Sequence, residues 1–397
     1  MIVTIVGGGP IGSAIAQELA ARPHITEIRV CDAKSRPLKS LANQISDRRV
    51  HSYQINAKDR NGLFSVAEGS SCIVAATDPS VNPMLASLAV ELGAHFCDNG
   101  GSDDIARQVL QLHEPAKGRG VWVVPNCGLS PGLVEILCLY GVEKFDTART
   151  ARIRVGNLPL APEDPFNFRL STSAHKVVED YSHHAHVIVD GEIESVEPLS
   201  NIEHVFFREP FGLLEAFSTA GSVVLLAGAL SDRVQELDLK TITWPGHADH
   251  MKFVLGLGFG ESKNIDIRTH LTYRDILVRA MQKHLGGMHK DAVLVRVLVS
   301  GIRDGQEQTM VLEMIDTFDD ETGMSAMRRC TGIPAAIITD MLITGQIDGG
   351  GASPPEQAID KSMFLTLLGE RGLHVSETWY DGSVNITDQT EHQGTAV

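Results

Sequence analysis

Short apolar runs alternate with segments of helical periodicity over the first third of the chain. An apolar run begins at Ile2, and Ala14, Ile15 and Leu19 then recur at the spacing of one helix face. Comparable runs, separated by further helical patterns, cover residues 28–31, 50–55, 71–76, 94–97 and 121–124. Strands that alternate with helices predict an α/β Rossmann fold, a doubly wound parallel sheet.

Longer runs with a period of two follow after residue 150. They cover residues 151–155, 185–189, 192–197, 240–244, 292–300 and 308–316. This alternation predicts an α+β domain with a mostly antiparallel sheet, one face of which is free for a substrate or a second subunit. A helical pattern from Thr331 to Leu342 ends near Gly345, and we expect it to pack back on the first domain.

These patterns divide the chain into two domains joined through tight turns. Residues 1–125 form the expected dinucleotide-binding Rossmann domain, with residues 331–370 packing back on it. Residues 126–330 form the expected substrate-binding and dimerisation domain, and residues 386–397 form a polar, flexible tail.

The composition is that of a soluble globular protein. The chain has 397 residues, 43% hydrophobic and 21% charged, which is enough for a sizeable core. Its formal net charge of -16 argues against nucleic acid or an anionic membrane as partner, because both need a basic patch. The six cysteines form no Cys-x-x-Cys pair and no signal peptide is visible, so we expect reduced thiols in a cytoplasmic protein. Because Met1 leads directly into the first run, we expect no targeting segment before the fold.

The first apolar run leads into the glycine pattern Gly7-x-Gly9-x-x-Gly12, with Pro10 and Ile11 inside it. Between a strand and a helix, such glycines make a tight turn, let the backbone approach a pyrophosphate and allow close helix packing. The sequence therefore predicts a dinucleotide-binding unit at the start of the chain.

Asp32 ends the next apolar run, where a carboxylate can accept both ribose hydroxyls and repel a 2'-phosphate. This position favours NAD over NADP. Lys34 and Arg36 lie close enough to pair with a 2'-phosphate, so NADP stays the alternative. Ala57 and Thr77, which follow later runs, are expected to line the adenosine and ribose.

Two loops, after the fifth and sixth runs, are expected to meet at the nicotinamide. Asp98 lies in the first loop and could orient an amine, act as a base if burial raised its pKa, or cap the following turn. Asn126 and Cys127 lie in the second loop and are expected to line the pocket. A nucleophilic role for Cys127 would need a lowered pKa, of which the sequence gives no sign. His175 is a further candidate for acid-base chemistry or for carboxylate binding.

Cationic and hydroxyl side chains of the second domain are candidates for substrate binding, since guanidinium donors match a carboxylate. They are Arg152, Arg154, Arg169, Lys176, Thr241 and Thr243.

Two groups of histidines have the proximity, but not the pattern, of metal ligands. His183, His184 and His186 fall in a strand-like stretch whose alternation sends His183 to the opposite face. His247 and His250 lack a cysteine or acidic partner at a recognised spacing. We expect no metal site.

Five segments give a more specific indication. They are the glycine pattern, residues 126–132 (NCGLSPG), 215–219 (EAFST), 244–247 (WPGH), and 331–334 (TGIP) with its helix. Over nearly the whole chain they resemble the saccharopine dehydrogenase-like family, and within it the lysine 6-dehydrogenases. The resemblance implies a homodimeric NAD(P)-dependent enzyme that oxidises an amine carbon, the ε-carbon for lysine, to an imine that water hydrolyses to an aldehyde.

Three positions depart from the pattern of the lysine enzymes. Thr243 stands where the family usually has Arg, and Ala220 and Asn126 stand where the lysine enzymes carry Asp. The cofactor residues match, so the predicted function is an NAD-dependent amine or amino-acid dehydrogenase acting on lysine or another amine. Two alternatives stay open: a saccharopine-type reductase working in the synthetic direction, and a non-catalytic paralogue that binds NAD.

Overall fold

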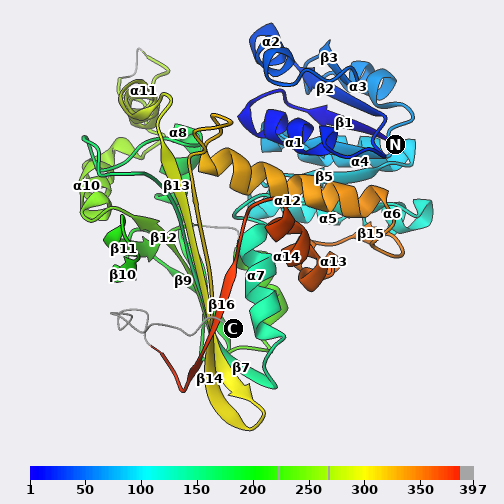
Figure 1. Cartoon of the computed structure of the whole chain (residues 1–397). Helices are drawn as coiled ribbons and strands as arrows, with labels where there is room; N and C mark the ends of the chain where they lie inside the picture. Colours follow the sequence, from blue (N-terminus) through cyan, green and yellow to red (C-terminus); the bar gives the residue numbers. More distant parts are fainter. Residues whose placement is uncertain (221–222, 267–268, 385–397) are drawn as a thin grey trace. The chain divides into compact units, whose positions relative to one another are not determined.

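The computed structural model describes residues 1–220, 223–266 and 269–384, and the chain forms two compact units (Figure 1). The first unit comprises Met1–Tyr140 and Arg328–His374, and the second comprises Gly141–Met327 and Val375–Val397. The expected boundary after residue 125 lies before the observed one. Backbone hydrogen bonds such as that from Cys127 N to Asp98 O, at 2.7 Å, hold the following segment in the first unit. The expected tail, residues 386–397, lies outside the described residues.

The first unit contains a seven-stranded sheet with the order β15-β6-β5-β4-β1-β2-β3, and every pairing in it is parallel. The strands are β1 (Ile2–Val6), β2 (Glu27–Asp32), β3 (Val50–Gln54), β4 (Cys72–Ala75), β5 (His95–Asp98), β6 (Trp122–Val124) and β15 (Gly351–Ala352). Val6 of β1 lies opposite Cys31 of β2 and Ala75 of β4, so these strands end level with one another. The predicted α/β fold with a parallel sheet is confirmed.

Helices cover the faces of this sheet. They are α1 (Pro10–Ala20), α2 (Ser35–Gln44), α3 (Arg60–Ala67), the short 3-10 helix η1 (Pro79–Val81), α4 (Asn82–Leu92), α5 (Asp103–Leu110), α6 (His113–Arg119), α13 (Pro355–Ala358) and α14 (Lys361–Glu370). Two longer elements, α7 (Leu133–Val142) and α12 (Ala326–Ile343), run across the limits of the unit. Ile73, Leu85 and Phe96 are fully buried in the core between strands and helices. Such burial on both faces explains why the strands read as continuous apolar runs.

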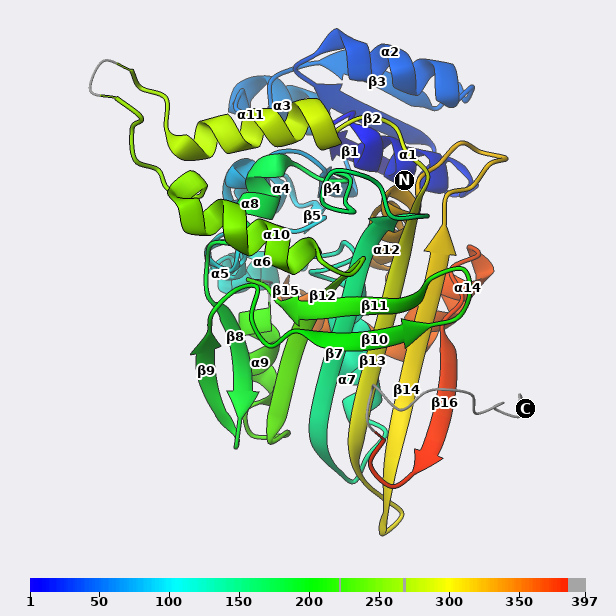
Figure 2. The same ribbon diagram turned by 90° about the vertical axis from the view of Figure 1, so that its left-hand side faces the viewer.

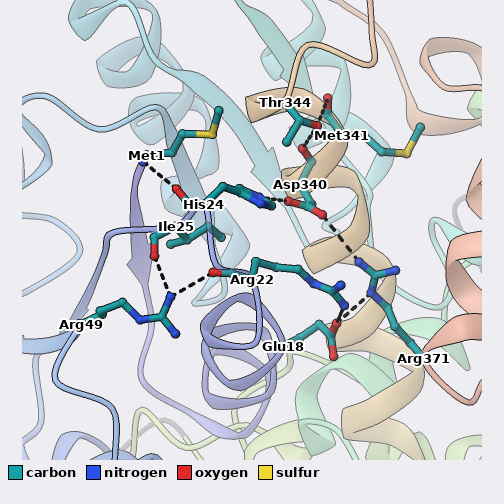
Figure 3. Close-up of polar contacts among 10 residues, drawn as sticks. All are labelled: Met1, Glu18, Arg22, His24, Ile25, Arg49, Asp340, Met341, Thr344 and Arg371. Atoms are coloured by element: carbon teal, nitrogen blue, oxygen red, sulfur yellow. Dashed lines mark hydrogen bonds and ion pairs between the residues drawn. The ribbon is translucent and has the colours of Figure 1, made fainter.

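An ion network attaches the returning segment to α1 within the first unit (Figure 3). Arg371, just after α14, lies 2.8 Å from Glu18 of α1 and 3.6 Å from Asp340 of α12. Asp340 also lies 2.6 Å from Nε2 of His24. The Arg371 side chain is only 4% exposed. Because a buried cation needs its partners, this network holds together three segments that are far apart in sequence.

The second unit is built on a nine-stranded sheet whose main path is β10-β11-β12-β7-β13-β14-β16, with β8 paired to β12 and β9 to β8. Its strands are β7 (Thr147–Pro159), β8 (Ala185–Val189), β9 (Glu192–Val196), β10 (Glu203–Phe207), β11 (Gly212–Ser218), β12 (Glu236–Thr243), β13 (Asp291–Arg303), β14 (Gln306–Thr317) and β16 (Ser376–Asp381). Only the pairing of β12 with β7 is parallel. The predicted mostly antiparallel sheet is confirmed.

The sequence pattern does not predict β10, β11 or β16. β10 and β11 carry apolar side chains on their outer face as well, and Phe206 and Leu213 are 37% and 53% exposed. The period of two is therefore blurred in these short strands.

The β10–β11 ribbon crosses one face of the sheet (Figure 2). Val205 and Phe207 of β10 are fully buried against the sheet. Beside this core, Arg154 of β7 is 1% exposed and donates to Asp238 through two nitrogens, each at 2.9 Å, and to Glu203 of β10. The ribbon is thus held by apolar burial and by a paired, buried guanidinium.

Helices form a second core in this unit. They are α8 (Ala174–Asp180), α9 (Val223–Leu230), α10 (His247–Val254), the π-helical turn η2 (Leu255–Phe259) and α11 (Tyr273–Leu285). Val178, Met251 and Met281 are buried where α8, α10 and α11 meet. Within the described residues, no helix has the length and apolar character needed to cross a bilayer.

The helix expected from Thr331 begins earlier, at Ala326. The carboxylate of Asp291, at the start of β13, accepts from Ala326 N at 2.8 Å and from Met327 N at 3.0 Å. A carboxylate at this position satisfies free N–H groups and opposes the positive end of the helix dipole. Since the cap comes from a distant strand, the local sequence does not reveal the helix start.

We expect Arg371→Ala to lower the free energy of unfolding by about 3 kcal/mol, because it removes a buried cation from two carboxylates. Urea unfolding followed by circular dichroism measures the loss. Arg60→Ala is the matched control, since Arg60 and its partner Glu91 are 43% and 48% exposed. An exposed pair contributes less than about 1 kcal/mol. Equal losses in the two variants would contradict the role given to the network.

Candidate active site

The fingerprint turn between β1 and α1 needs glycine at two positions. A Cβ atom at Gly7 would lie 2.1 Å from the carbonyl oxygen of Ala76, and one at Gly12 would lie 1.8 Å from that of Gly7. A Cβ atom at Gly9 would meet no other atom within 4 Å. Gly9 therefore faces open space at the N-terminus of α1, whose first N–H groups have no side-chain cap. This geometry fits a pyrophosphate.

Asp32 ends β2 beside this turn. Its Oδ2 accepts from Gly8 N at 2.9 Å, and its Oδ1 accepts from Lys34 N at 2.8 Å. The carboxylate supports the turn, and each oxygen retains acceptor capacity for a ribose hydroxyl. The turn and Asp32 together fit the adenosine half of a nicotinamide dinucleotide.

The other expected cofactor residues follow the same edge of the sheet. Pro10 and Ile11 form the first turn of α1, Thr77 follows β4, and Ala57 follows β3. All four are at least partly exposed. Their place beyond the carboxyl ends of parallel strands is where such sheets bind ligands.

Asp98, the last residue of β5, is a buried carboxyl in the first unit. Its Oδ1 accepts from Gly100 N at 2.8 Å and from Asn126 N at 2.9 Å, so it ties the loop after β5 to the loop after β6. The side chain is 1% exposed, and burial raises its pKa to about 7, against the opposing effect of these hydrogen bonds. Asp98 therefore caps a turn and also has a pKa that suits a general base near neutral pH.

Two buried amides accompany this carboxyl. Asn126 is 4% exposed and adopts a left-handed φ of 65°, and Asn82, at the start of α4, is 2% exposed and hydrogen-bonds Asp98. The Oδ1 atoms of both amides have no hydrogen-bond donor among the described residues. Buried amide oxygens normally have a partner, so these two acceptors fit N–H groups of a bound ligand.

Cys127 lies in the same loop but has the surroundings of a structural thiol. It is fully buried, its Sγ donates to Val124 O at 3.2 Å, and burial raises its pKa. A nucleophilic thiol needs the opposite shift. All six cysteines are free and buried.

Sequence reasoning misses two buried carboxyls of the first unit. Glu135 of α7 and Glu356 of α13 are each 3% exposed. The signal for Glu135 is visible in the sequence, where it is the one charged residue of the apolar helix Leu133–Val142. For Glu356 we find no comparable signal.

The arginine candidates lie in the second unit, and each is already paired. Arg152 contacts Glu236 at 3.2 Å, and Arg154 is committed to Asp238 and Glu203. Arg169 contacts Glu163 at 2.6 Å and lines a 480 Å³ surface pocket that also includes His289 and Lys290.

Lys176 and Thr241 reach the same part of the second unit. Lys176 pairs with Asp180 one turn along α8, and burial raises the pKa of Asp180 to about 6. The carbonyl oxygen of Asp180 accepts from Ala220 N at 2.9 Å, next to Thr219, whose hydroxyl lies 2.8 Å from that of Thr241. His175, in contrast, is exposed on α8.

Thr243 is buried and bonded within the fold. Its hydroxyl donates to Glu215 at 3.3 Å, and the same carboxylate accepts from Gly246 N at 2.9 Å and Ala248 N at 2.8 Å. Glu215 of β11 therefore caps α10. Two of the segments noted in the sequence, 215–219 and 244–247, are the two halves of this cap.

The histidines take structural positions. His247 is fully buried, bonds Tyr181 and the carbonyl oxygen of Phe166, and is held neutral because burial lowers its pKa to about 4. His184 contacts Glu197 at 3.0 Å. Within the described ranges, no group of three or more His, Cys, Asp or Glu side chains could hold a metal ion.

Comparison with known families covers almost the whole chain. Residues 3–124 match the saccharopine dehydrogenase NADP binding domain, and residues 128–373 match the saccharopine dehydrogenase C-terminal domain. The chain belongs to the saccharopine dehydrogenase family.

Individual relatives agree with this assignment. Carboxyaminopropylagmatine dehydrogenase of Synechocystis sp. is 21% identical over 94% of this chain and 96% of its own length. Mitochondrial alpha-aminoadipic semialdehyde synthase of Mus musculus is 22% identical over 89% of this chain, which spans only 45% of that longer protein.

Solved structures show the same fold. Saccharopine dehydrogenase (L-Glu forming) from Saccharomyces cerevisiae superposes with a TM-score of 0.78 at 16% identity, covering 96% of this chain and 99% of that one. Homospermidine synthase from Legionella pneumophila, in complex with NAD, gives 0.70 at 11% identity, covering 99% and 95%.

Family membership confirms the expected class, an NAD(P)-dependent oxidoreductase acting on CH-NH or CH-NH2 groups. The finer resemblance to lysine 6-dehydrogenases is not supported in particular, since these relatives carry other names.

We expect Gly9→Ala and Gly12→Ala to separate binding from folding. A methyl group at residue 12 collides with the Gly7 carbonyl and should cost more than about 2 kcal/mol of stability. One at residue 9 meets open space and should cost less than about 1 kcal/mol while weakening dinucleotide binding. Thermal unfolding and fluorescence titration with NADH measure the two effects. Unchanged NADH affinity in Gly9→Ala would exclude residue 9 from the binding site.

Proposed function

We propose that this protein is an NAD-dependent amine or amino-acid dehydrogenase that resembles the lysine 6-dehydrogenases and releases an aldehyde after imine hydrolysis. The observation that carries the proposal is Asp98, a buried carboxyl whose pKa is raised to about 7. It ends β5 of the same parallel sheet that carries the glycine turn after β1. Family membership supports the carbon–nitrogen chemistry.

The reaction needs a hydride acceptor, a base and acceptors for N–H groups. Bound nicotinamide supplies the hydride acceptor. Ionised Asp98 takes a proton from the amine nitrogen as the amine carbon becomes an imine carbon. The free Oδ1 atoms of Asn82 and Asn126 accept N–H groups of the substrate or of the carboxamide. Water then adds to the imine, and the carbon–nitrogen bond breaks to give an aldehyde and the released amine or ammonia.

We assign NAD as the cofactor because of Asp32. A 2'-phosphate would place a second negative charge against this carboxylate, which is held in place by Gly8 N and Lys34 N. Lys34 and Arg36 are the residues that would have to offset this repulsion if NADP were bound.

A saccharopine-type reductase working in the synthetic direction is the second candidate. It is favoured by the end-to-end match to carboxyaminopropylagmatine dehydrogenase and by the fold of saccharopine dehydrogenase (L-Glu forming). In that direction an amine and a carbonyl condense to an imine, which takes a hydride from reduced nicotinamide and a proton.

The substrate carboxylate, the oligomer and the compartment are proposed on narrower grounds. Lys176 and Arg169 are the cations we assign to a substrate carboxylate, because each keeps part of its side chain exposed, 43% and 26% respectively. The family resemblance supports a homodimer. The six free thiols support a reducing, cytoplasmic location.

A substrate panel tests the proposed direction. NAD or NADP is mixed at alkaline pH with lysine, ornithine, other diamines, plain amino acids and saccharopine, and absorbance of the reduced cofactor is followed. Turnover with an amine and NAD is the expected result. Turnover only with NADPH, a keto acid and an amine would favour the synthetic reductase, and tight NAD binding without turnover would favour a non-catalytic paralogue.

We expect Asp98→Asn to lower turnover by about 100-fold or more while changing NAD affinity little. The amide oxygen can still accept from Gly100 and Asn126, so the loops keep their tie. In the parent protein, kcat/KM for amine oxidation should rise with pH through about 7, because only ionised Asp98 is a base. This rise should be absent from the variant. Equal losses of turnover and NAD affinity would make Asp98 a structural residue.

A further inference from the structure

The loop of residues 126–132, here called the site loop, is closed by a carboxyl. Within the loop, Gly128 N donates to Pro131 O at 3.0 Å. At its end, Gly132 has a φ of 138°, and its N–H donates to Oε2 of Glu135 in the first turn of α7. Glu135 therefore fixes the point where the site loop passes into a helix.

Glu135 has negative neighbours. Glu356 of α13 and Asp103 of α5 both act on it as like charges. Lys361 is the cation beside Glu356, and its Nζ donates to the carbonyl oxygen of Glu356 at 3.1 Å. Cys138, one turn along α7, is a further titratable neighbour. Burial raises the pKa of Glu135 to about 8 and that of Glu356 to about 7.

The second carboxyl oxygen of Glu135 is the informative atom. Oε1 is buried and has no hydrogen-bond partner among the described residues. Two carboxylates that are each 97% buried (3% exposed) cannot both stay ionised at low cost, since their desolvation and mutual repulsion add together. A proton held between them removes one charge. It also leaves Oε2 of Glu135 able to accept from the loop.

We propose that Glu135 and Glu356 share one proton, and that this proton keeps the site loop in position for cofactor binding. The second half of the inference rests on the proposed function, in which Asn126 of the site loop borders the nicotinamide. Glu135 is a positioning residue here, because it acts through Gly132. Loss of the shared proton leaves two buried negative charges that drive Glu135 away from its buried place and release the Gly132 N–H.

The linkage to stability has a definite sign. Folded Glu135 keeps its proton up to about pH 8, whereas an unfolded glutamate loses it near the ordinary value of 4.5. The unfolded state therefore binds fewer protons between these values. Stability falls as pH rises through this window and levels off above about 8.

Thermal unfolding of the full chain between pH 6 and 9 tests the shared proton. The melting temperature of the parent protein should fall over this range. Glu135→Gln keeps an acceptor for Gly132 but cannot ionise, so its melting temperature should fall markedly less. In Glu356→Gln the remaining fall should be complete at lower pH, because the neighbouring charge no longer raises the pKa of Glu135.

Glu114→Gln is the matched control, since the Glu114 side chain is 83% exposed on α6. Its curve should parallel that of the parent protein. A Glu135→Gln curve that also parallels the parent overturns the shared proton. If Glu135→Gln does not fold, an unshifted Glu356→Gln curve overturns it.

NADH titration by fluorescence at pH 7 and pH 9 tests the positioning role. The parent protein should bind several-fold more weakly at pH 9, and Glu135→Gln should bind equally at both. The same weakening in both proteins overturns the positioning role. Failure of every protein to bind NADH contradicts the proposed function and the positioning role with it, while the unfolding curves still decide the shared proton.

Discussion

Backbone N–H groups at the ends of strands and helices need acceptors, and in this protein side-chain carboxylates from elsewhere in the chain supply many of them. Asp32 and Asp98 accept such groups at the carboxyl edge of the first sheet, and Glu135 does so at the end of the site loop. Glu215 and Asp291 do so at the starts of α10 and α12. A buried N–H without an acceptor is costly. These carboxylates therefore decide where loops close and where helices begin, and the site depends on them.

The same contacts explain why acidic groups in this chain behave so differently from one another. Asp47 is exposed, and a hydrogen bond to Arg49 lowers its pKa to about 2. Asp98 and Glu135 also accept hydrogen bonds, but burial outweighs them and raises their pKa values to about 7 and 8. Desolvation is thus the larger effect in the first unit. A carboxyl that is held in place for structural reasons becomes, through burial alone, a group that exchanges protons near neutral pH.

In the second unit the polar groups mostly satisfy one another. Arg154, His247 and Thr243 are buried and bonded within the fold, which removes them from the groups that can bind a substrate directly. Lys176 and Thr241 lie near the surface of α8 and the end of β12 and retain exposed area. The distinction follows from packing: the same residue types support the sheet where the β10–β11 ribbon covers them, and remain available to a ligand where it does not.

The sequence alone determined the class of each unit, because the run of buried strands and the period-two strands are local patterns, and it determined the dinucleotide turn, because Gly7-x-Gly9-x-x-Gly12 and Asp32 follow each other within one strand-turn-helix-strand unit. It also placed Asp98 and Asn126 in neighbouring loops. Only the tertiary structure decided that Thr243 is bonded to Glu215, that α12 begins under Asp291, and that Glu135 lies against Glu356. Each of these depends on burial and on a partner far away in the chain. Neither is written in the residues around a position, since both arise only when distant segments pack together.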